Sequence, residues 1–527
     1  MRASSSFLRF ALLAIALLCA CGPGAFDNLT GGVPPITGDP DAAVIAPRPV
    51  APISVSTIPS LRPKLRWELK GDLTGAILEL CRTRACATLE KTFDVQGTEL
   101  VIPEDLAPGV WYWRLRGRSG TRVGTTFSPT WQFVVRGGAK NASSTAPQQM
   151  VLDLNGDGEA DVVATGITGT NAELYVWFGQ PNGALPETPS FVYDRLATIA
   201  AGSSVVVGGG ADVDGDGFAD AYVGLQLVED GETYGTVVPI FGGPDGIRPG
   251  QYFAELDGYD DFGRTVREAG DVNGDGYGDV IVGAVGDAFV VFGEPTYALS
   301  RTMTAIVFGD SGADESGRAV LGAFDATGDG LADVVTGTSW EDESALVSVS
   351  EEGTTMLSDD YDLGPDYEEA GQATALAAGD LDGNALAEVL VAGSNPTRSF
   401  VCLFTAFDAR GAVPIDCKTS TPDKSTFGIA ATSADLDGDG VEEMIVASKI
   451  PERLDLDVVR ATPLIAFEPL AQPGLGAALT TIWPGRPGPA RWAAASAEAE
   501  EIVVFENAAK KQVLRPPPGK TFARSIR

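Results

Sequence analysis

The chain has 527 residues, with 37 Lys and Arg against 72 Asp and Glu, no histidine, and a formal net charge of -35. A charge of this sign repels phosphate backbones and anionic membrane surfaces, so neither nucleic acid nor direct membrane contact is expected. The absence of histidine excludes Ser-His and Cys-His activation of a nucleophile and removes the commonest transition-metal ligand.

The N-terminus has the features of an export signal. The first 20 residues carry Arg2 and Arg9 before an apolar run that is too short to span a bilayer. The run ends in LCAC, which is similar to a bacterial lipobox, and the resemblance implies that Cys21 becomes a lipidated N-terminus. Gly22 after this cysteine favours a location at the outer membrane or the cell surface of the bacterial envelope. The lipid would then be the one membrane anchor of the protein. Ordinary cleavage without lipid is the alternative.

Composition divides the rest of the chain into four parts. Residues 21–47 are rich in Gly and Pro without hydrophobic periodicity, which indicates a flexible tether. Residues 48–136 contain short strand patterns, and residues 137–147 form a second linker. Residues 148–527 contain an internal repeat.

The segment 48–136 carries a motif of known β-sandwiches. Leu106, Pro108, Gly109 and Tyr112 match the L-x-P-G-x-x-Y corner of fibronectin type III domains, which this segment resembles. The resemblance implies that the Tyr112 hydroxyl bonds back to the backbone and pins a strand corner. It also implies that Trp67 is a core residue on the second strand.

Six near-copies of one acidic loop recur every 54 to 59 residues. They begin at Asp153, Asp212, Asp271, Asp325, Asp380 and Asp435. Each copy places oxygen-bearing side chains at alternate positions. A glycine that permits a sharp turn follows them in every copy except the fifth, where Ala385 stands instead. This pattern suits calcium, which takes about 6 to 8 oxygen ligands. A repeat of this length indicates a solenoid, a propeller or an array.

The flanking residues decide the type of repeat. An EF-hand needs helices and a Glu at loop position 12, but Ala, Val or Thr occupies that position in all six loops. A β-branched run follows each loop, aromatic-glycine turns such as WFG and IFG come later, and openings such as FGRTV precede several loops. Together these residues resemble the FG-GAP repeats of the integrin alpha-subunit propeller. In that family each repeat is one four-stranded blade, and the loop holds calcium between two strands.

The resemblance implies up to six calcium ions, held by loop positions 1, 3, 5 and 9. The implied ligands are Asp153, Asn155, Asp157, Asp161, Asp212, Asp214, Asp216, Asp220, Asp271, Asn273, Asp275, Asp279, Asp325, Thr327, Asp329, Asp333, Asp380, Asp382, Asn384, Glu388, Asp435, Asp437, Asp439 and Glu443. Thr327 weakens the fourth loop, and Asn384 with Ala385 weakens the fifth.

The repeat count predicts seven blades. The segment from Leu475 aligns without a gap with the third repeat, although Pro484 and Trp492 stand at ligand positions, so no ion is expected there. The predicted fold is all-β, a seven-bladed β-propeller preceded by a fibronectin type III-like β-sandwich. A linear array of independent β units is the alternative, and it would leave exposed edges.

The two ends of the repeat region predict ring closure. The C-terminal residues 522–527 resemble the opening of the third repeat at Phe262, whereas the segment before Asp153 lacks such an opening. We therefore predict that residues 519–527 lie against the first blade. A frayed tail is the alternative.

Four cysteines outside the export segment form two local pairs, Cys81 with Cys86 and Cys402 with Cys417. Such pairs suit disulfides in an oxidising compartment. Free buried thiols are the alternative, because spacing alone does not establish the geometry.

These features favour a binding protein over an enzyme. We interpret the chain as a monomeric, calcium-binding surface lipoprotein that binds a protein or a glycan. Acidic stretches from Glu255, Ser339 and Asp360 fall where integrin-like propellers contact ligands, and plain solvation is their alternative explanation. A propeller hydrolase or lyase that acts on polysaccharide through a carboxylate pair is one rival, and a structural envelope component is another.

Overall fold

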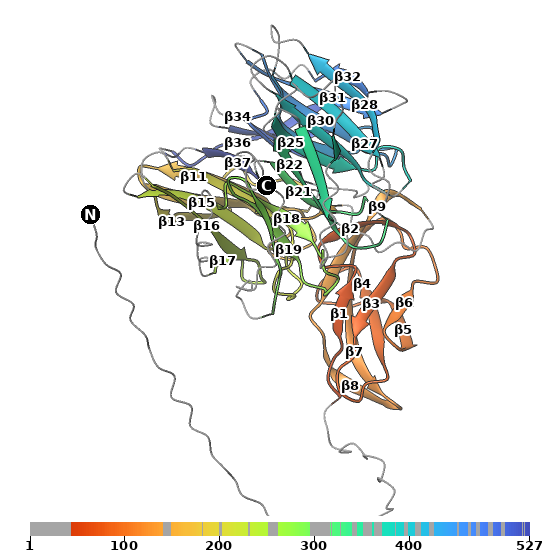
Figure 1. Cartoon of the computed structure of the whole chain (residues 1–527). Coiled ribbons are helices and arrows are strands. Elements are labelled where there is room, and N and C mark those ends of the chain that lie inside the picture. Colours follow the sequence, from red (N-terminus) through yellow and green to blue (C-terminus); the bar gives the residue numbers. More distant parts are fainter. Residues whose placement is uncertain are drawn as a thin grey trace, which may run out of the picture. The chain divides into compact units, whose positions relative to one another are not determined.

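The computed structural model is all-β, with 37 strands and no helix among the residues that it describes (Figure 1). It describes residues 44–527 apart from 141–148, 182, 200–202, 230–231, 251–261, 296–316, 318, 327, 340–344, 351–360, 363–371, 385, 395–398, 406–412, 421–425, 451–452, 462–464, 471–474, 483–488, 497–500, 519 and 521. The search for a helix long and apolar enough to cross a membrane found none in this part of the chain. The export segment, the tether and Cys21 lie outside the described residues.

The first nine strands form two sheets. They are β1 (Arg48–Ala51), β2 (Ser56–Ser60), β3 (Lys64–Glu68), β4 (Gly75–Cys81), β5 (Leu89–Gln96), β6 (Glu99–Val101), β7 (Gly109–Ser119), β8 (Arg122–Phe127) and β9 (Trp131–Lys140). One sheet has the order β1-β3-β6, and the other contains β2-β9-β7-β4-β5 with β8 paired to β7. Strand β9 runs to Lys140, four residues beyond the expected boundary at 136, and residues 141–148 lie outside the described residues.

Aromatic residues from both sheets fill one core. Trp67 of β3 packs in a buried cluster with Trp111, Trp113 and Trp131. Side chains alternate between the two faces of a strand, so Tyr112 on β7 faces away from this core. It packs instead against the Cys81 and Cys86 pair.

A neighbouring residue also bonds across the expected corner. The Trp111 indole donates to the Ala107 carbonyl over 2.9 Å. The Tyr112 hydroxyl lies close to Gly158, where an added Cβ would come within 2.5 Å of it. The expected bond of the Tyr112 hydroxyl to the backbone stays a prediction.

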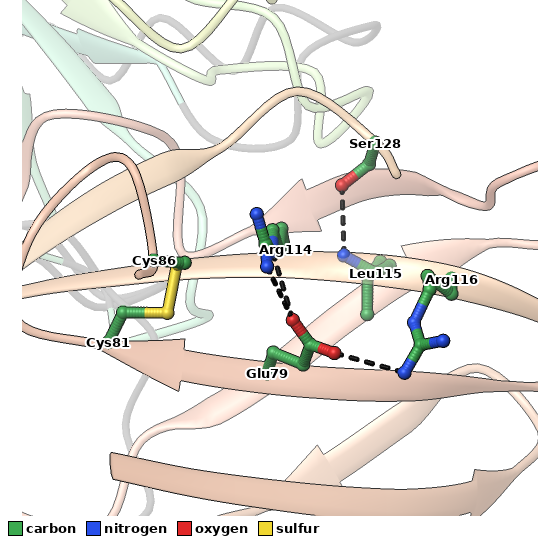
Figure 2. Close-up of a disulfide and its surroundings, with 7 residues drawn as sticks. All are labelled: Glu79, Cys81, Cys86, Arg114, Leu115, Arg116 and Ser128. Atoms are coloured by element: carbon green, nitrogen blue, oxygen red, sulfur yellow. Dashed lines mark hydrogen bonds and ion pairs between the residues drawn. A yellow bond between two sulfur atoms is a disulfide. The ribbon is translucent and has the colours of Figure 1, made fainter. Parts of the chain in front are cut away.

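Figure 2 shows the outer face of β4 and β7 around the Cys81–Cys86 disulfide. Glu79 is buried, and its carboxylate accepts from Arg114 over 2.9 Å and from Arg116 over 3.0 Å. The two guanidiniums compensate the buried negative charge, which would otherwise be costly. On β7, between Arg114 and Arg116, the Leu115 amide donates to the Ser128 hydroxyl over 3.0 Å.

The remaining strands follow the sequence repeat. They are β10 (Gln149–Met150), β11 (Val162–Thr168), β12 (Asn171–Trp177), β13 (Phe191–Thr198), β14 (Val205–Gly209), β15 (Ala221–Glu229), β16 (Glu232–Phe241), β17 (Arg248–Pro249), β18 (Thr265–Gly270), β19 (Asp279–Gly283), β20 (Ala288–Val291), β21 (Ala319–Phe324), β22 (Asp333–Ser339), β23 (Ala345–Ser350), β24 (Tyr361–Asp362), β25 (Gln372–Gly379), β26 (Glu388–Ser394), β27 (Ser399–Thr405), β28 (Val413–Ser420), β29 (Thr426–Ala434), β30 (Glu443–Ile450), β31 (Arg453–Ala461), β32 (Ile465–Pro469), β33 (Ala478–Thr481), β34 (Arg491–Ser496), β35 (Glu501–Glu506), β36 (Ala509–Leu514) and β37 (Phe522–Ile526).

Strands β11 to β37 form seven antiparallel sheets of three or four described strands. Their orders are β13-β12-β11-β37, β14-β15-β16-β17, β18-β19-β20, β21-β22-β23-β24, β25-β26-β27-β28, β29-β30-β31-β32 and β33-β34-β35-β36. In sheets two to six, one acidic loop connects the first two strands. The predicted β-branched runs therefore form the second strand of each sheet.

The C-terminal strand β37 completes the first sheet. It pairs antiparallel with β11, and the Arg527 and Val163 backbones exchange two hydrogen bonds of 2.6 and 2.9 Å. Strand β10, which precedes the first acidic loop, pairs instead with β2. The predicted contact between the two ends of the repeat region is thus confirmed, and the frayed tail is excluded for these residues.

In the seventh sheet, an apolar side chain occupies a position that holds an oxygen ligand in the other loops. Trp492 occupies the position equivalent to the closing carboxylate of the other loops, is fully buried, and stacks on Phe505 with the ring centroids 4.1 Å apart. Pro484 lies outside the described residues.

Candidate metal centre

The acidic loops owe their shape to paired glycines. In the five loops with the sequence Gly-Asp-Gly, both glycines have φ between +70° and +98°. A Cβ is strained in this left-handed region, so the sequence needs glycine at positions 4 and 6. The fifth loop keeps Gly383 at φ +72°, while Ala385 lies outside the described residues.

Backbone amides orient the carboxylates at both ends of each loop. In all six loops the carboxylate at position 9 accepts the amide of position 2 over 2.6 to 2.9 Å. In the Gly-Asp-Gly loops the position 1 carboxylate accepts the amide of the second glycine over 2.8 to 3.0 Å. The aromatic-glycine turns contribute too, because Gly179, Gly242 and Gly293 donate to the position 9 carboxylates of the first three loops.

Three loops bring carboxylates from positions 1, 3 and 9 together. Within each loop, one oxygen from each residue lies within 4.8 Å of the other two. The groups are Asp212 with Asp214 and Asp220, Asp380 with Asp382 and Glu388, and Asp435 with Asp437 and Glu443. The first and third loops carry Asn at position 3, and Thr327 of the fourth loop lies outside the described residues.

Buried oxygens without a hydrogen-bond donor occur at position 1 of these loops. Oδ1 of Asp212 and Oδ1 of Asp271 are two of them. A buried carboxylate oxygen without a partner costs free energy, and a bound cation would remove that cost.

Crowding and burial disfavour the charged forms of these carboxyls. Burial, with help from Asp275, raises the pKa of Asp271 to about 7. Burial also raises the pKa of Asp153 to about 6, against the opposing effect of Arg84. The pKa of Asp214 rises to about 6 through burial and the neighbouring Asp216.

The donor set fits calcium. Carboxylate and amide oxygens are hard ligands, and the crowded, cation-poor arrangement is the one that a divalent ion stabilises. Positions 1 and 9 are buried in most of the loops, whereas Asp157, Asp329, Asp382, Asn384, Asp437 and Asp439 are exposed. In the loops that contain these exposed residues, positions 3 or 5 would thus complete the site from the solvent side, whereas Asp214 of the second loop is buried.

Hydrogen bonds connect consecutive loops into one chain. The amide at position 8 of each of the last five loops donates to the position 1 carbonyl of the loop before it, over 2.7 to 3.3 Å. The donors are Ala219, Gly278, Ala332, Ala387 and Glu442. A change in one loop is therefore transmitted directly to the backbone of its neighbour.

The region of strands β1 to β9 contacts these loops within the compact unit Ala43–Arg527, and nothing in the sequence indicated this. Arg84, inside the disulfide loop, donates to the carbonyls of Gly156 and Gly217 over 2.9 and 2.8 Å. Gln132 donates to Asp153 Oδ2 over 2.8 Å. Two of the predicted calcium loops are thus held by side chains more than 20 residues away in sequence.

A second arginine reaches the last two loops. Arg136 is buried, lies 3.5 Å from Asp380 and 3.9 Å from Glu442, and donates to the Gly440 carbonyl. Its charge opposes the burial that raises the pKa of Glu442 to about 7. Arg136 thus compensates part of the negative charge of the fifth and sixth loops.

The cysteine pairs agree with the sequence expectation. Cys81 and Cys86 form a disulfide. Cys402 is also disulfide-bonded, and the backbone of Cys417 lies directly opposite it between β27 and β28.

The fold and the loops define a propeller-type scaffold with FG-GAP-like repeats. Residues 153–223 match the model of the FG-GAP-like repeat. The chain is 27% identical over 284 residues to Integrin alpha pat-2 of Caenorhabditis briggsae and 31% identical over 159 residues to Integrin alpha-4 of Xenopus laevis. These matches cover 47% and 28% of this chain, but only 22% and 15% of the two relatives.

Similar solved structures include a protein from Lactobacillus plantarum, with 11% identity, a TM-score of 0.42, and coverage of 70% of this chain and 98% of that one. A rhamnogalacturonan lyase from Bacillus licheniformis has 13% identity and a TM-score of 0.28, with coverage of 89% of this chain and 70% of that one.

Proposed function

We propose that the chain is a calcium-binding, lipid-anchored protein of the bacterial envelope that binds a protein or a glycan through a seven-bladed propeller. The observation that carries the proposal is the set of three carboxylate clusters in loops of one repeating sequence. Crowded carboxylates with raised pKa values and unpartnered buried oxygens favour a resident cation.

The strand pairings support seven blades in a closed ring. Seven successive sheets occur in one repeat region, and β37 from the C-terminus supplies the strand that the first sheet lacks. Such a closing strand covers an edge that would otherwise be open to association.

The first domain is proposed to be a fibronectin type III-like sandwich. Its three-stranded β1-β3-β6 sheet and its larger β4, β5, β7 and β9 sheet share one tryptophan-rich core. This division of strands is common in sandwiches of the immunoglobulin type.

The proposed ligand surface is the propeller face away from the calcium loops. Arg84, Gln132 and Arg136 already occupy carbonyls and carboxylates of the loops, so that end has a partner within the chain. The acidic stretches from Glu255, Ser339 and Asp360 fall mostly on residues outside those described.

A polysaccharide-cleaving activity receives less support than binding. A carboxylate pair in a central pocket would favour it. Among the described residues, the central cavity is lined by one carboxylate, Glu268, and that group is paired with Arg527. We therefore propose a binding module and not an enzyme.

Capture of a surface partner tests the proposal. The purified chain, immobilised in calcium, is expected to retain a protein or glycan from envelope extracts, and chelator is expected to release it. A matched column of the Asp212→Asn, Asp380→Asn and Asp435→Asn triple variant controls for retention by charge alone. Equal retention on both columns, with and without chelator, would contradict a calcium-dependent binding module.

The anchor is tested separately. Cys21→Ser removes the proposed lipid attachment site, and the protein is then expected to leave the membrane fraction. If this variant still sediments with membranes after a high-salt wash, the lipid anchor is wrong.

A further inference from the structure

The inner strands of several sheets surround a cavity of about 230 Å³ at the centre of the repeat region. Residues from β18, β21, β25, β29, β33 and β37 line it. This volume is many times what one water molecule needs, and it lies below the usual range for drug-sized ligands. The cavity therefore has the size for a single small molecule.

The charge on the cavity wall is opposite to that of the whole chain. Its charged lining residues are Arg267, Arg527 and Glu268, so two positive charges face one negative charge. The chain as a whole has a formal charge of -35. A surplus positive charge within such an acidic protein favours an anion at this point.

Arg527 and Glu268 compensate each other. A guanidinium nitrogen of Arg527 lies 2.5 Å from Glu268 Oε1, and Arg527 also donates to the Gly209 carbonyl over 2.8 Å. The Glu268 side chain is only 8% exposed, so the pair is held in the wall. The two charges of this pair compensate each other, and Glu268 also attracts Arg267.

Arg267 is the surplus charge. It has no hydrogen bond or ion pair with any residue that the structure describes, while Thr265 on the same strand donates to the Gly317 carbonyl over 2.8 Å. Burial lowers the pKa of Arg267; the negative charge of Glu268 opposes that effect, and the nearby Arg527 adds to it. A planar guanidinium without a hydrogen-bond partner among the described residues matches a carboxylate, which it can bind through two parallel hydrogen bonds.

We propose that this cavity binds a small carboxylate of monosaccharide size, with its carboxylate on Arg267. The site is separate from the acidic loops, and it requires neither calcium in the loops nor the lipid anchor.

Isothermal titration of the purified full chain with D-glucuronate tests the site, with D-glucose as the neutral match. The assay contains calcium, so that a failure of binding is not a consequence of metal loss. Glucuronate is expected to bind and to raise the melting temperature, and glucose is expected to do neither. No heat and no shift with glucuronate, or equal responses to both sugars, would overturn the proposal.

Arg267→Gln is expected to weaken glucuronate binding by at least about tenfold, because a charged bidentate contact is lost. The matched variant Arg515→Gln removes a guanidinium that is 67% exposed and bonded to Glu501, and it should bind as the wild type does. Arg267→Lys keeps the charge without the planar fork and should bind with intermediate affinity, which covers the case in which Arg267→Gln does not fold. Unchanged affinity in the Arg267 variants, or equal protection by inorganic phosphate, would overturn the assignment.

Discussion

The acidic loops and the central cavity have unbalanced charges of opposite sign. Asp212, Asp214 and Asp220 bring three carboxylates within 4.8 Å, whereas the cavity holds two arginines against one glutamate. Burial makes each imbalance costly, since an uncompensated charge in a poorly solvated place is destabilising. The excess charge of each region therefore predicts the sign of its ligand. The loops favour a cation, and the cavity favours an anion.

The C-terminal strand links the two regions, and its removal should have the largest effect. Deleting residues 519–527 removes β37 from the first sheet and Arg527 from the cavity. It also exposes the edge of β11, so we expect the melting temperature to fall by about 10 °C and aggregation to increase.

Arg527→Gln is the control for this deletion, because it removes the charge and leaves the strand. A calorimetric scan should place it much closer to the wild type than to the deletion. An unchanged midpoint in the deleted chain would show that β37 does not stabilise the ring.

Asp212→Asn should act in opposite directions with and without calcium. With calcium it removes a charged ligand, and we expect a loss of about 1–3 kcal/mol in the free energy of unfolding. In chelator it removes a buried negative charge whose Oδ1 lacks a donor, and the melting temperature should rise. Asp245→Asn, at an exposed position outside the loops, is the matched control and should change neither midpoint. The same sign of change in both conditions would contradict the cation requirement.

The pH dependence should also reverse with calcium. Burial raises the pKa of Asp153 to about 6 and those of Asp271 and Glu443 to about 7, all above their unfolded values. Without metal, these groups contribute stability below pH 4 that is lost as the pH rises toward 7. With calcium, the ligands must be deprotonated, so metal stabilisation grows over the same range.

Thermal scans from pH 5 to pH 8, in chelator and in calcium, check this prediction. The midpoint should fall with pH in chelator and should fall less, or rise, in calcium. Parallel curves in the two conditions would contradict the prediction, because they would show that metal binding does not depend on deprotonation of the carboxyls with raised pKa values.

The smallest effect is expected where the sandwich meets the loops. Arg84→Ala removes bonds to Gly156 and Gly217, at an expected cost of about 0.5–1.5 kcal/mol. Arg82→Ala is the matched control, because Arg82 lies in the same loop but donates to Val110 and Ala107 of the sandwich. In calorimetry, the N-terminal two-sheet region of the Arg84 variant should unfold in a transition separate from that of the repeat region. The Arg82 variant should show no such separate transition.

The local chemistry of the loops was predictable from sequence. Gly-Asp-Gly specifies two left-handed residues, alternating oxygens specify a hard-cation site, and the following β-branched run specifies a strand. The pairing of β37 with β11 was also predictable, because residues 522–527 repeat an opening that the first repeat lacks.

Long-range placement was not predictable. Arg267 and Arg527 are 260 positions apart, and nothing in the sequence signals that they line the same cavity. Arg84 and Arg136 resemble ordinary surface arginines until the fold sets them against the loops. The packing of Tyr112 against Cys81 and Cys86 was likewise not signalled by its motif, which does not specify the neighbours of its ring.

Calcium-dependent melting of the intact chain tests the central claim most directly. Thermal midpoints are measured over a calcium titration that starts in chelator and covers about 10⁻⁵ to 10⁻² M, the range that includes extracellular calcium modules. The account predicts a midpoint that rises with calcium around 10⁻⁴ to 10⁻³ M and returns to its starting value when chelator is added back. Identical midpoints across the whole titration would contradict it.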